Sequence, residues 1–226
     1  MTSIFRRALG GDFDRLHPRL RERFGFAAGD GRGCVGTGVM RRIWPRAGIA
    51  RPLLALGASR NILFPEQGTD IPFTIENHAY LDRYGRDTLT FVRTFEFPHR
   101  RRRFDATMVY NDERGCVVDY LGTHQHVAVD LRPEVGERGE LRIRSGEQRV
   151  RGLRLDVRWP TALTGAADVR ESFDDELGRF RIAVRVTNPL RGLVLAYSGT
   201  FDVTYVDTTT SALPASVKPL REEPRG

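Results

Sequence analysis

Apolar and polar residues alternate one by one along most of the chain from Pro72 onward, most clearly between Leu193 and Tyr205. Every second residue of that stretch is apolar or glycine, and the residues between them are mostly small or polar. Successive side chains of a strand point to opposite faces, so this period of two predicts a long strand with one face against a core.

The same alternation recurs between short turn sequences such as Asn111 to Gly115, where Asn, Asp and Gly favour a hairpin turn. It predicts about nine or ten strands joined mostly by short loops. The expected strands are a glycine-rich first strand over Cys34 to Met40, then Phe73 to Leu81, Leu89 to Phe97, Phe104 to Tyr110, Cys116 to Tyr120, Thr123 to Leu131, one around Leu141 and Ile143, Ala167 to Phe173, Phe180 to Val186, and Leu193 to Tyr205.

Helical spacing of apolar residues is confined to the front of the chain. Helices are expected at Ser3 to Leu9, capped by Ser3, at Asp12 to Phe24 and at Ala50 to Ala58. No strand-helix-strand rhythm follows, which excludes a parallel sheet and predicts a mainly β fold: a curved antiparallel sheet or a barrel-like, calycin-like meander.

The length suits one domain with a sizeable core. We expect a single β-rich domain over residues 1–206, with a helical segment over 1–25 packed on it. The final residues, 207–226, have no hydrophobic period and are expected to form a disordered tail. The mouth of a barrel of this size is a common place for a small ligand.

Charge and cysteine content limit the expected partners and the expected cellular location of the protein. The chain carries 36 basic and 29 acidic residues for a net charge of +7, and Lys218 is its one lysine. Acidic residues are interspersed with the arginines, so no nucleic-acid partner is expected, and the run from His99 to Arg103 is interpreted as a solvated loop. Two cysteines, no signal-peptide core and no long apolar run predict a soluble cytoplasmic protein without an integral membrane segment. The oligomeric state is left open.

The closest pair of histidines, His124 and His126, would share one face of a strand and could supply two metal ligands. A third ligand would have to come from His78, Glu76 or Asp130. Because the spacing fixes no third ligand, hydrogen-bonded or surface histidines are the favoured interpretation, and we predict no metal site and no cofactor.

A second candidate site depends on Arg93, which the alternation places among phenylalanines on the inner face. A buried arginine needs a partner, and Glu76 and Asp105 could form a polar cluster with it inside the barrel. Such a cluster could hold the polar end of a ligand, supply a general base, or merely neutralise Arg93. Tyr197 is expected to line the core or a cavity.

Four segments resemble one bacterial family. Residues FRRALGGDFDRLHPRLRERFG (5–25), NILFPEQGTDIPFTIEN (61–77), RRFDATMVY (102–110) and FRIAVRVTNPLRGLVLAYSGTF (180–201) are similar to the family of domains of unknown function DUF4166. The resemblance covers nearly the whole chain. It implies an accessory domain that occurs alone or attached to modules such as oxidoreductase-like domains, and it assigns no residue a role.

Three functions follow from these observations. The favoured one is a binding module for a small apolar or amphipathic ligand, contacted by Arg93 or the histidines. A cavity packed shut by Phe91, Phe95, Phe104 and Phe201 would count against it. The alternatives are a cofactor-free isomerase or hydrolase that uses the interior carboxylates and histidines, and an interaction domain for a partner protein or a fused oxidoreductase-like module.

Overall fold

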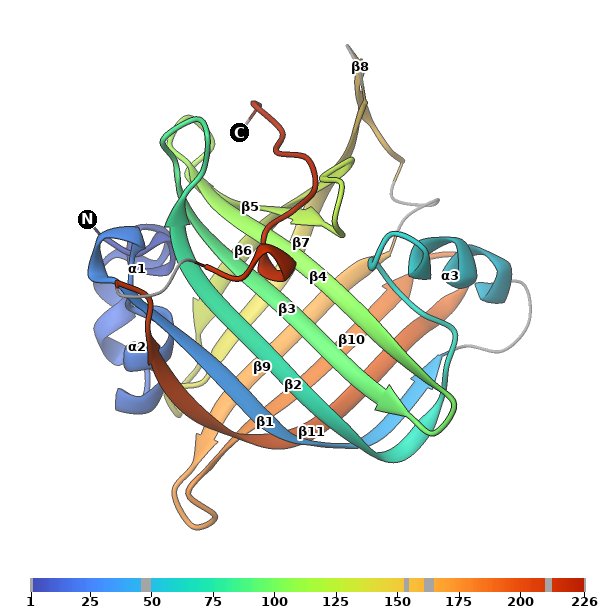
Figure 1. Ribbon diagram of the computed structural model, residues 1–226, viewed down its shortest axis with the longest axis horizontal. Helices are drawn as coiled ribbons and strands as arrows, with labels where there is room; N and C mark the ends of the chain where they lie inside the picture. Colours follow the sequence, from blue (N-terminus) through green and yellow to red (C-terminus); the bar gives the residue numbers. More distant parts are fainter. Residues whose placement is uncertain (1, 46–49, 153–154, 161–164, 210–212, 226) are drawn as a thin grey trace.

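The chain folds around one antiparallel sheet, shown in the computed structural model of Figure 1. The structure describes residues 2–45, 50–152, 155–160, 165–209 and 213–225. The helical elements are α1 (Ile4–Leu9), η1 (Gly10–Arg15), α2 (Pro18–Phe24), η2 (Ala28–Asp30), α3 (Ala50–Ala58) and η4 (Ala215–Val217). The strands are β1 (Arg32–Pro45), β2 (Gly68–Leu81), β3 (Asp87–Phe97), β4 (Arg100–Asn111), β5 (Cys116–Leu121), β6 (Val127–Val135), β7 (Leu141–Gly152), β8 (Leu155–Arg158), β9 (Ala166–Asp174), β10 (Arg179–Asn188) and β11 (Gly192–Asp207).

The sheet closes into a barrel because its two ends meet. The strand order is β6-β5-β4-β3-β2-β1-β11-β10-β9-β7-β8, and β6 pairs with β7 in addition. Ten strands therefore form a closed antiparallel barrel, and β8 is an extra strand paired with β7. This confirms the predicted fold class, including the short helices at the N-terminus.

The glycines of the first strand allow two strands to cross at close range. A side-chain carbon on Gly38 would lie 2.0 Å from the carbonyl oxygen of Thr200, and one on Gly199 would lie 2.1 Å from that of Val39. These residues occupy neighbouring places in the β1 and β11 register, where Gly38 pairs with Phe201 and Met40 pairs with Gly199. Only glycine leaves room for that approach.

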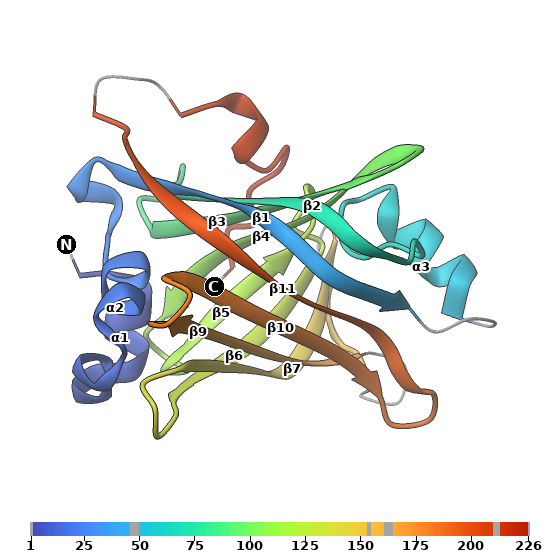
Figure 2. The same cartoon turned by 90° about the horizontal axis from the view of Figure 1, so that it is seen from below.

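The N-terminal helices cover one end of the barrel, opposite the end where α3 lies (Figures 1 and 2). Ser3 caps α1 by accepting a hydrogen bond from the backbone N–H of Arg6 at 3.2 Å, as expected. Phe5 and Phe24 meet edge to face with centroids 4.9 Å apart, and Phe24 stacks on Phe91 of the wall. We call this closed end the floor.

A buried ion pair fixes the floor to the wall. Arg23 of α2 is 1% exposed, and its Nε lies 2.5 Å from Oε1 of Glu171 on β9. Its Nη1 also donates to Oδ1 of Asn77 at 2.7 Å and contacts the sulfur of Cys34 at 3.1 Å. The pair joins residues that are 148 positions apart in the sequence, so the helices hold a fixed place against the barrel.

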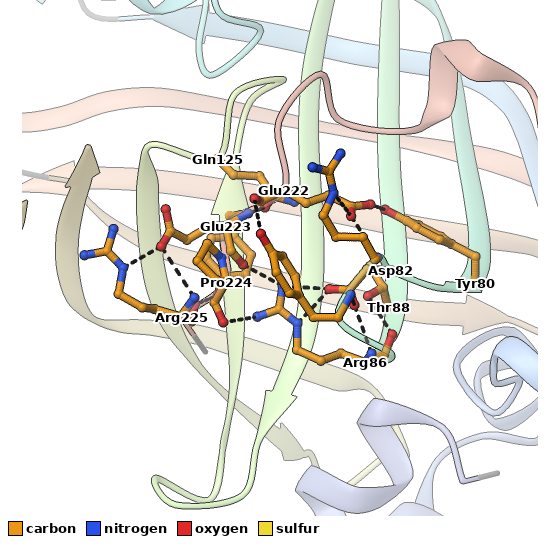
Figure 3. A network of polar contacts seen from close by, with 12 residues as sticks. Tyr80, Asp82, Arg86, Thr88, Gln125, Glu222, Glu223, Pro224 and Arg225 are labelled. Atoms are coloured by element: carbon orange, nitrogen blue, oxygen red, sulfur yellow. Dashed lines mark hydrogen bonds and ion pairs between the residues drawn. The ribbon is translucent and has the colours of Figure 1, made fainter. Parts of the chain in front are cut away.

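The C-terminal residues were expected to be disordered, but residues 213–225 run back over the outer face of the barrel (Figure 1). Glu223 is fully buried, and its backbone N–H donates to Oε1 of Gln125 at 2.6 Å. Arg86 on the loop between β2 and β3 donates to the carbonyl oxygen of Glu223 at 2.6 Å (Figure 3). Arg83 on the same loop donates to Glu222 at 3.1 Å. Ion pairs and backbone contacts hold this segment, which explains why it has no hydrophobic period.

The run from His99 to Arg103 was predicted to be a solvated loop, but most of it lies in a strand. Pro98 and His99 alone form the turn, and β4 begins at Arg100, so the arginines belong to a strand. Arg101 pairs with Glu96 at 2.7 Å and Arg102 with Glu66 at 2.6 Å. The positive run is therefore largely neutralised by carboxylates on adjacent segments. None of the helices in the described part of the chain combines the length and the apolar character that a membrane crossing requires.

We predict that Glu171→Ala destabilises the protein strongly, by about 3–5 kcal/mol, because it leaves the buried Arg23 charge without its partner. The free energy of unfolding in urea measures this. Asp202→Ala is the matched control, because Asp202 pairs with Arg179 on the surface and its side chain is 59% exposed. The control should unfold almost as the unaltered protein does. Equal, small effects of the two substitutions would contradict the role given to the ion pair.

Candidate functional site

The barrel encloses a cavity of about 730 Å³. Apolar side chains from nearly every strand line it, and α3 with the segment after it, Trp159 and the β10–β11 turn lie at one end. Leu56 and Trp159 at that end are 70% and 45% exposed, so the cavity reaches the surface there, and we call this end the mouth. Phe24 of the floor lines the opposite end.

The phenylalanines that could have filled the interior leave it open. Phe95 and Phe201 pack on Phe73 of β2, with ring centroids 5.1 and 6.2 Å from it. Phe91 and Phe104 line the cavity as part of its wall. Phe91 and Phe104 therefore shape the cavity, and none of the four rings fills it.

Arg93 points into the cavity from β3, as the alternation predicted. It is 6% exposed, and its guanidinium carbon lies 3.8 Å from the centre of the Phe104 ring, its neighbour on β4. Nη1 donates a hydrogen bond to the hydroxyl of Tyr197 at 3.3 Å, while Nε has no hydrogen-bond partner among the described residues. The aromatic ring and the hydroxyl hold the guanidinium in place, and part of its hydrogen-bonding capacity stays open.

Asp119 of β5 also lines the cavity and is 6% exposed. Its neighbours across the sheet are Met108 on β4 and Val129 on β6. Both side chains are apolar and donate no hydrogen bond to a carboxyl. Oδ1 has no partner within the described ranges, and no arginine or lysine there lies within ion-pair distance. Burial raises the pKa of Asp119 to about 7, and the charge of Arg93 opposes that rise.

Glu171 is the other carboxylate in the lining, but it is already satisfied. Its ion pair with Arg23 neutralises it at the floor. The cavity therefore contains one carboxyl that is paired for structure and one, Asp119, that is not.

The predicted cluster of Glu76, Arg93 and Asp105 does not form inside the barrel. Arg93 pairs in register with Ile75 and Phe104 on the inner face, whereas Glu76 and Asp105 both align with Val92, which puts them on the outer face. The residue alternation that placed Arg93 inside thus excludes both carboxylates from that side.

On the outer face, Glu76 and Asp105 have separate surroundings. Asp105 accepts hydrogen bonds from Arg103 at 2.9 Å and from the side chain of Asn61 at 3.2 Å, and so fastens the segment after α3 to the wall. Burial raises its pKa, against the effect of Arg103. His78 is 4% exposed, with Nε2 3.8 Å from Oε2 of Glu76, and burial lowers its pKa.

His124 and His126 lie in the loop before β6 and not on a strand, because Gly122 and Gln125 both have positive φ and interrupt the extended chain. Their rings stack with centroids 5.8 Å apart. Burial lowers the pKa of His126, and nearby arginines add to this effect. In the described ranges no three His, Cys, Asp or Glu side chains gather as metal ligands, and Asp130 pairs with Arg114 at 2.7 Å.

Asp119 is the site residue that sequence reasoning missed. It stands in a short apolar strand, Cys116 to Leu121, with Val117 and Leu121 two positions to either side. Val117 and Asp119 lie on the same face of this strand. If Val117 had been assigned to the inner face, the period of two that located Arg93 would have placed Asp119 there as well. Tyr197, which was predicted to line the core or a cavity, is 1% exposed and contacts Arg93.

The fold and this site define the class of protein: a closed, hollow antiparallel β-barrel with a mostly apolar interior. The family described as "Domain of unknown function (DUF4166)" matches residues 16–201, and the chain belongs to this family, which confirms the resemblance. The chain is also similar to the protein of Bacillus subtilis (strain 168) named "Uncharacterized protein YndH". The two are 35% identical over 204 residues, which cover 89% of this chain and 97% of the relative.

We predict that Asp119→Asn stabilises the protein at pH 8 but much less at pH 5. A carboxyl whose pKa rises from 3.8 when unfolded to about 7 when folded contributes stability below pH 3.8 and loses it as the pH climbs to about 7. An amide has no such loss, so its advantage should grow between the two pH values, to a few kcal/mol at about 1.4 kcal/mol per pKa unit. Urea unfolding of both proteins at both pH values measures it. A pH-independent difference would contradict a raised pKa.

Proposed function

We propose that the barrel binds a small apolar or amphipathic molecule in its cavity, with Arg93 and Asp119 contacting the polar end of that molecule. The observation that carries the proposal is the buried carboxyl of Asp119, which has no hydrogen bond to Oδ1 within the described chain. A buried polar group without a partner costs about 1–3 kcal/mol or more. A ligand group that supplies the partner removes that cost.

The size and lining of the cavity support the same function. A volume of about 730 Å³ falls in the range of about 300–1,000 Å³ that is usual for small-molecule sites. Such sites are mostly apolar, with a few placed polar groups that fix the orientation of the ligand. Here Arg93, held by Phe104 and Tyr197, and Asp119 supply those groups.

We predict that protein purified gently from producing cells retains a small molecule, and that Val184→Phe abolishes this retention. Val184 lines the cavity on β10, so the larger ring occupies ligand space. Native mass spectrometry measures the retained mass. A second measurement is the fluorescence of the neutral dye N-phenyl-1-naphthylamine, which increases in an apolar site.

The matched control is Val39→Phe, the same substitution at a side chain that is 41% exposed. It should keep both the retained mass and the dye signal. Absence of both signals in the unaltered protein, or an equal loss in the two variants while both stay folded by circular dichroism, would refute the binding function.

A second candidate function is a cofactor-free proton transfer, favoured by the pKa of Asp119, which burial raises to about 7. The carboxylate would take a proton from the carbon between a carbonyl and an alkene. The electron pair of that C–H bond would form an enolate whose oxygen faces Arg93, and the proton would return to the far alkene carbon. The net reaction shifts a β,γ-unsaturated ketone to its conjugated isomer, and atoms and charge balance.

We predict for this second candidate that a β,γ-unsaturated ketone with a long alkyl chain becomes conjugated faster with the protein than without it. The rise in ultraviolet absorbance follows the reaction. Asp119→Asn should remove the acceleration, while Asp202→Asn on the outer surface should keep it. A rate equal to that in buffer would exclude this reaction and leave the binding function intact.

A further inference from the structure

The charges that face the cavity do not balance. Glu171 is neutralised by Arg23, so among the described residues the remaining interior charges are those of Arg93 and Asp119. Two further arginines, Arg60 and Arg191, line the mouth, and neither forms an ion pair with a residue in the described ranges. The cavity therefore presents an excess of positive charge to any molecule that enters it.

Arg93 is the positive charge deepest in this apolar space. Its contacts are a ring face and a neutral hydroxyl, and no carboxylate of the described chain lies within ion-pair distance of it. An arginine buried in this way is favoured by a negatively charged partner, and a carboxylate fits its planar guanidinium through two parallel hydrogen bonds. Nε, which has no partner in the described chain, supplies a donor for that contact.

Asp119 limits the protonation state of a carboxylate that binds beside Arg93. Two carboxyl groups that share a site of low dielectric do not both ionise, so the pair holds one proton between them. The elements beside Asp119 contribute Met108 from β4 and Val129 from β6, which do not titrate. Arg93 from β3 is the charge that acts on it, and Glu171 across the cavity is held in its pair with Arg23.

We propose that the ligand is an amphipathic carboxylate whose head group pairs with Arg93 and shares one proton with Asp119, so that uptake of the anion above neutral pH takes up a proton. This rests on the proposed binding function and names the ligand class of the same cavity. The hydrocarbon part of the ligand lies against the apolar lining, which belongs to the same walls that carry the two polar groups.

The test compares dodecanoate with 1-dodecanol, two probes with the same chain and different head groups, by isothermal titration calorimetry. Dodecanoate is kept below its critical micelle concentration and 1-dodecanol below its solubility limit. The affinity for dodecanoate should fall about tenfold per pH unit between pH 7.5 and 9, since one proton enters with each anion. The affinity for 1-dodecanol should stay nearly constant. Calorimetry in buffers of different ionisation enthalpy should count about one proton taken up per dodecanoate at pH 8.5.

Substitutions assign the two roles. Asp119→Asn keeps the size of the side chain and cannot titrate, so it should bind dodecanoate with an affinity independent of pH and with no proton uptake. Arg93→Met should weaken dodecanoate binding at least tenfold and 1-dodecanol binding much less, because a neutral hydroxyl loses a hydrogen bond and no ion pair. Asp202→Asn and Arg179→Met, from the solvent-facing pair on the same barrel, are the matched controls and should bind both probes as the unaltered protein does.

Each other outcome is decisive. Equal and pH-independent affinities for the two probes would overturn the carboxylate proposal while the binding function stands. Binding of 1-dodecanol alone would also overturn the carboxylate proposal and leave the binding function standing.

A pH dependence that persists in Asp119→Asn would place the proton on the ligand and overturn the part given to Asp119. Binding of neither probe would overturn this proposal, whereas the binding function is decided separately by the retained mass and by N-phenyl-1-naphthylamine. If Arg93→Met does not fold, Arg93→Lys should still bind dodecanoate more weakly, and the proton count in Asp119→Asn decides independently.

Discussion

The pairing of β6 with β7 is the constraint on which the rest of the structure depends. It turns a curved sheet into a closed wall, and every second residue of ten strands then faces an interior. A closed wall satisfies its own backbone, so the interior side chains decide what the barrel can hold. The floor completes the enclosure, since Arg23 fixes α2 to Glu171 on β9, 148 positions away in the sequence.

Two buried carboxyls in this enclosure differ because one of them is paired and the other is not. Glu171 meets Arg23 and belongs to the framework. Asp119 has apolar neighbours on both adjacent strands, and its nearest charge, Arg93, lies beyond ion-pair distance. The charge of Glu171 is compensated by Arg23, whereas burial raises the pKa of Asp119 to about 7. A carboxyl group thus forms a fixed ion pair at one end of the cavity and a titratable group further along the wall.

The period of two predicted the wall and the inward position of Arg93, and helical spacing predicted the front helices, because these depend on local patterns that a sequence displays directly. The same alternation places Glu76 and Asp105 on the opposite face from Arg93. The predicted cluster was wrong because it grouped these residues by opposite charge and disregarded the face on which each one lies. What the sequence did not reveal depends on contacts between distant segments. The pairing of Arg23 with Glu171 and the seating of Glu223 on Gln125 leave no periodic trace.

Replacing an unpaired interior carboxyl by an apolar residue of similar size usually stabilises a protein. At Asp119 the neighbouring side chains are apolar already, so a leucine or methionine there would suit the wall better than an aspartate does. Arg93 presents the same contrast, since an apolar residue would pack on Phe104 without the cost of burying a charge. Neither group improves the packing of the barrel wall. Both point into one cavity that reaches the surface, and this placement is the reason why we propose a ligand with a polar end.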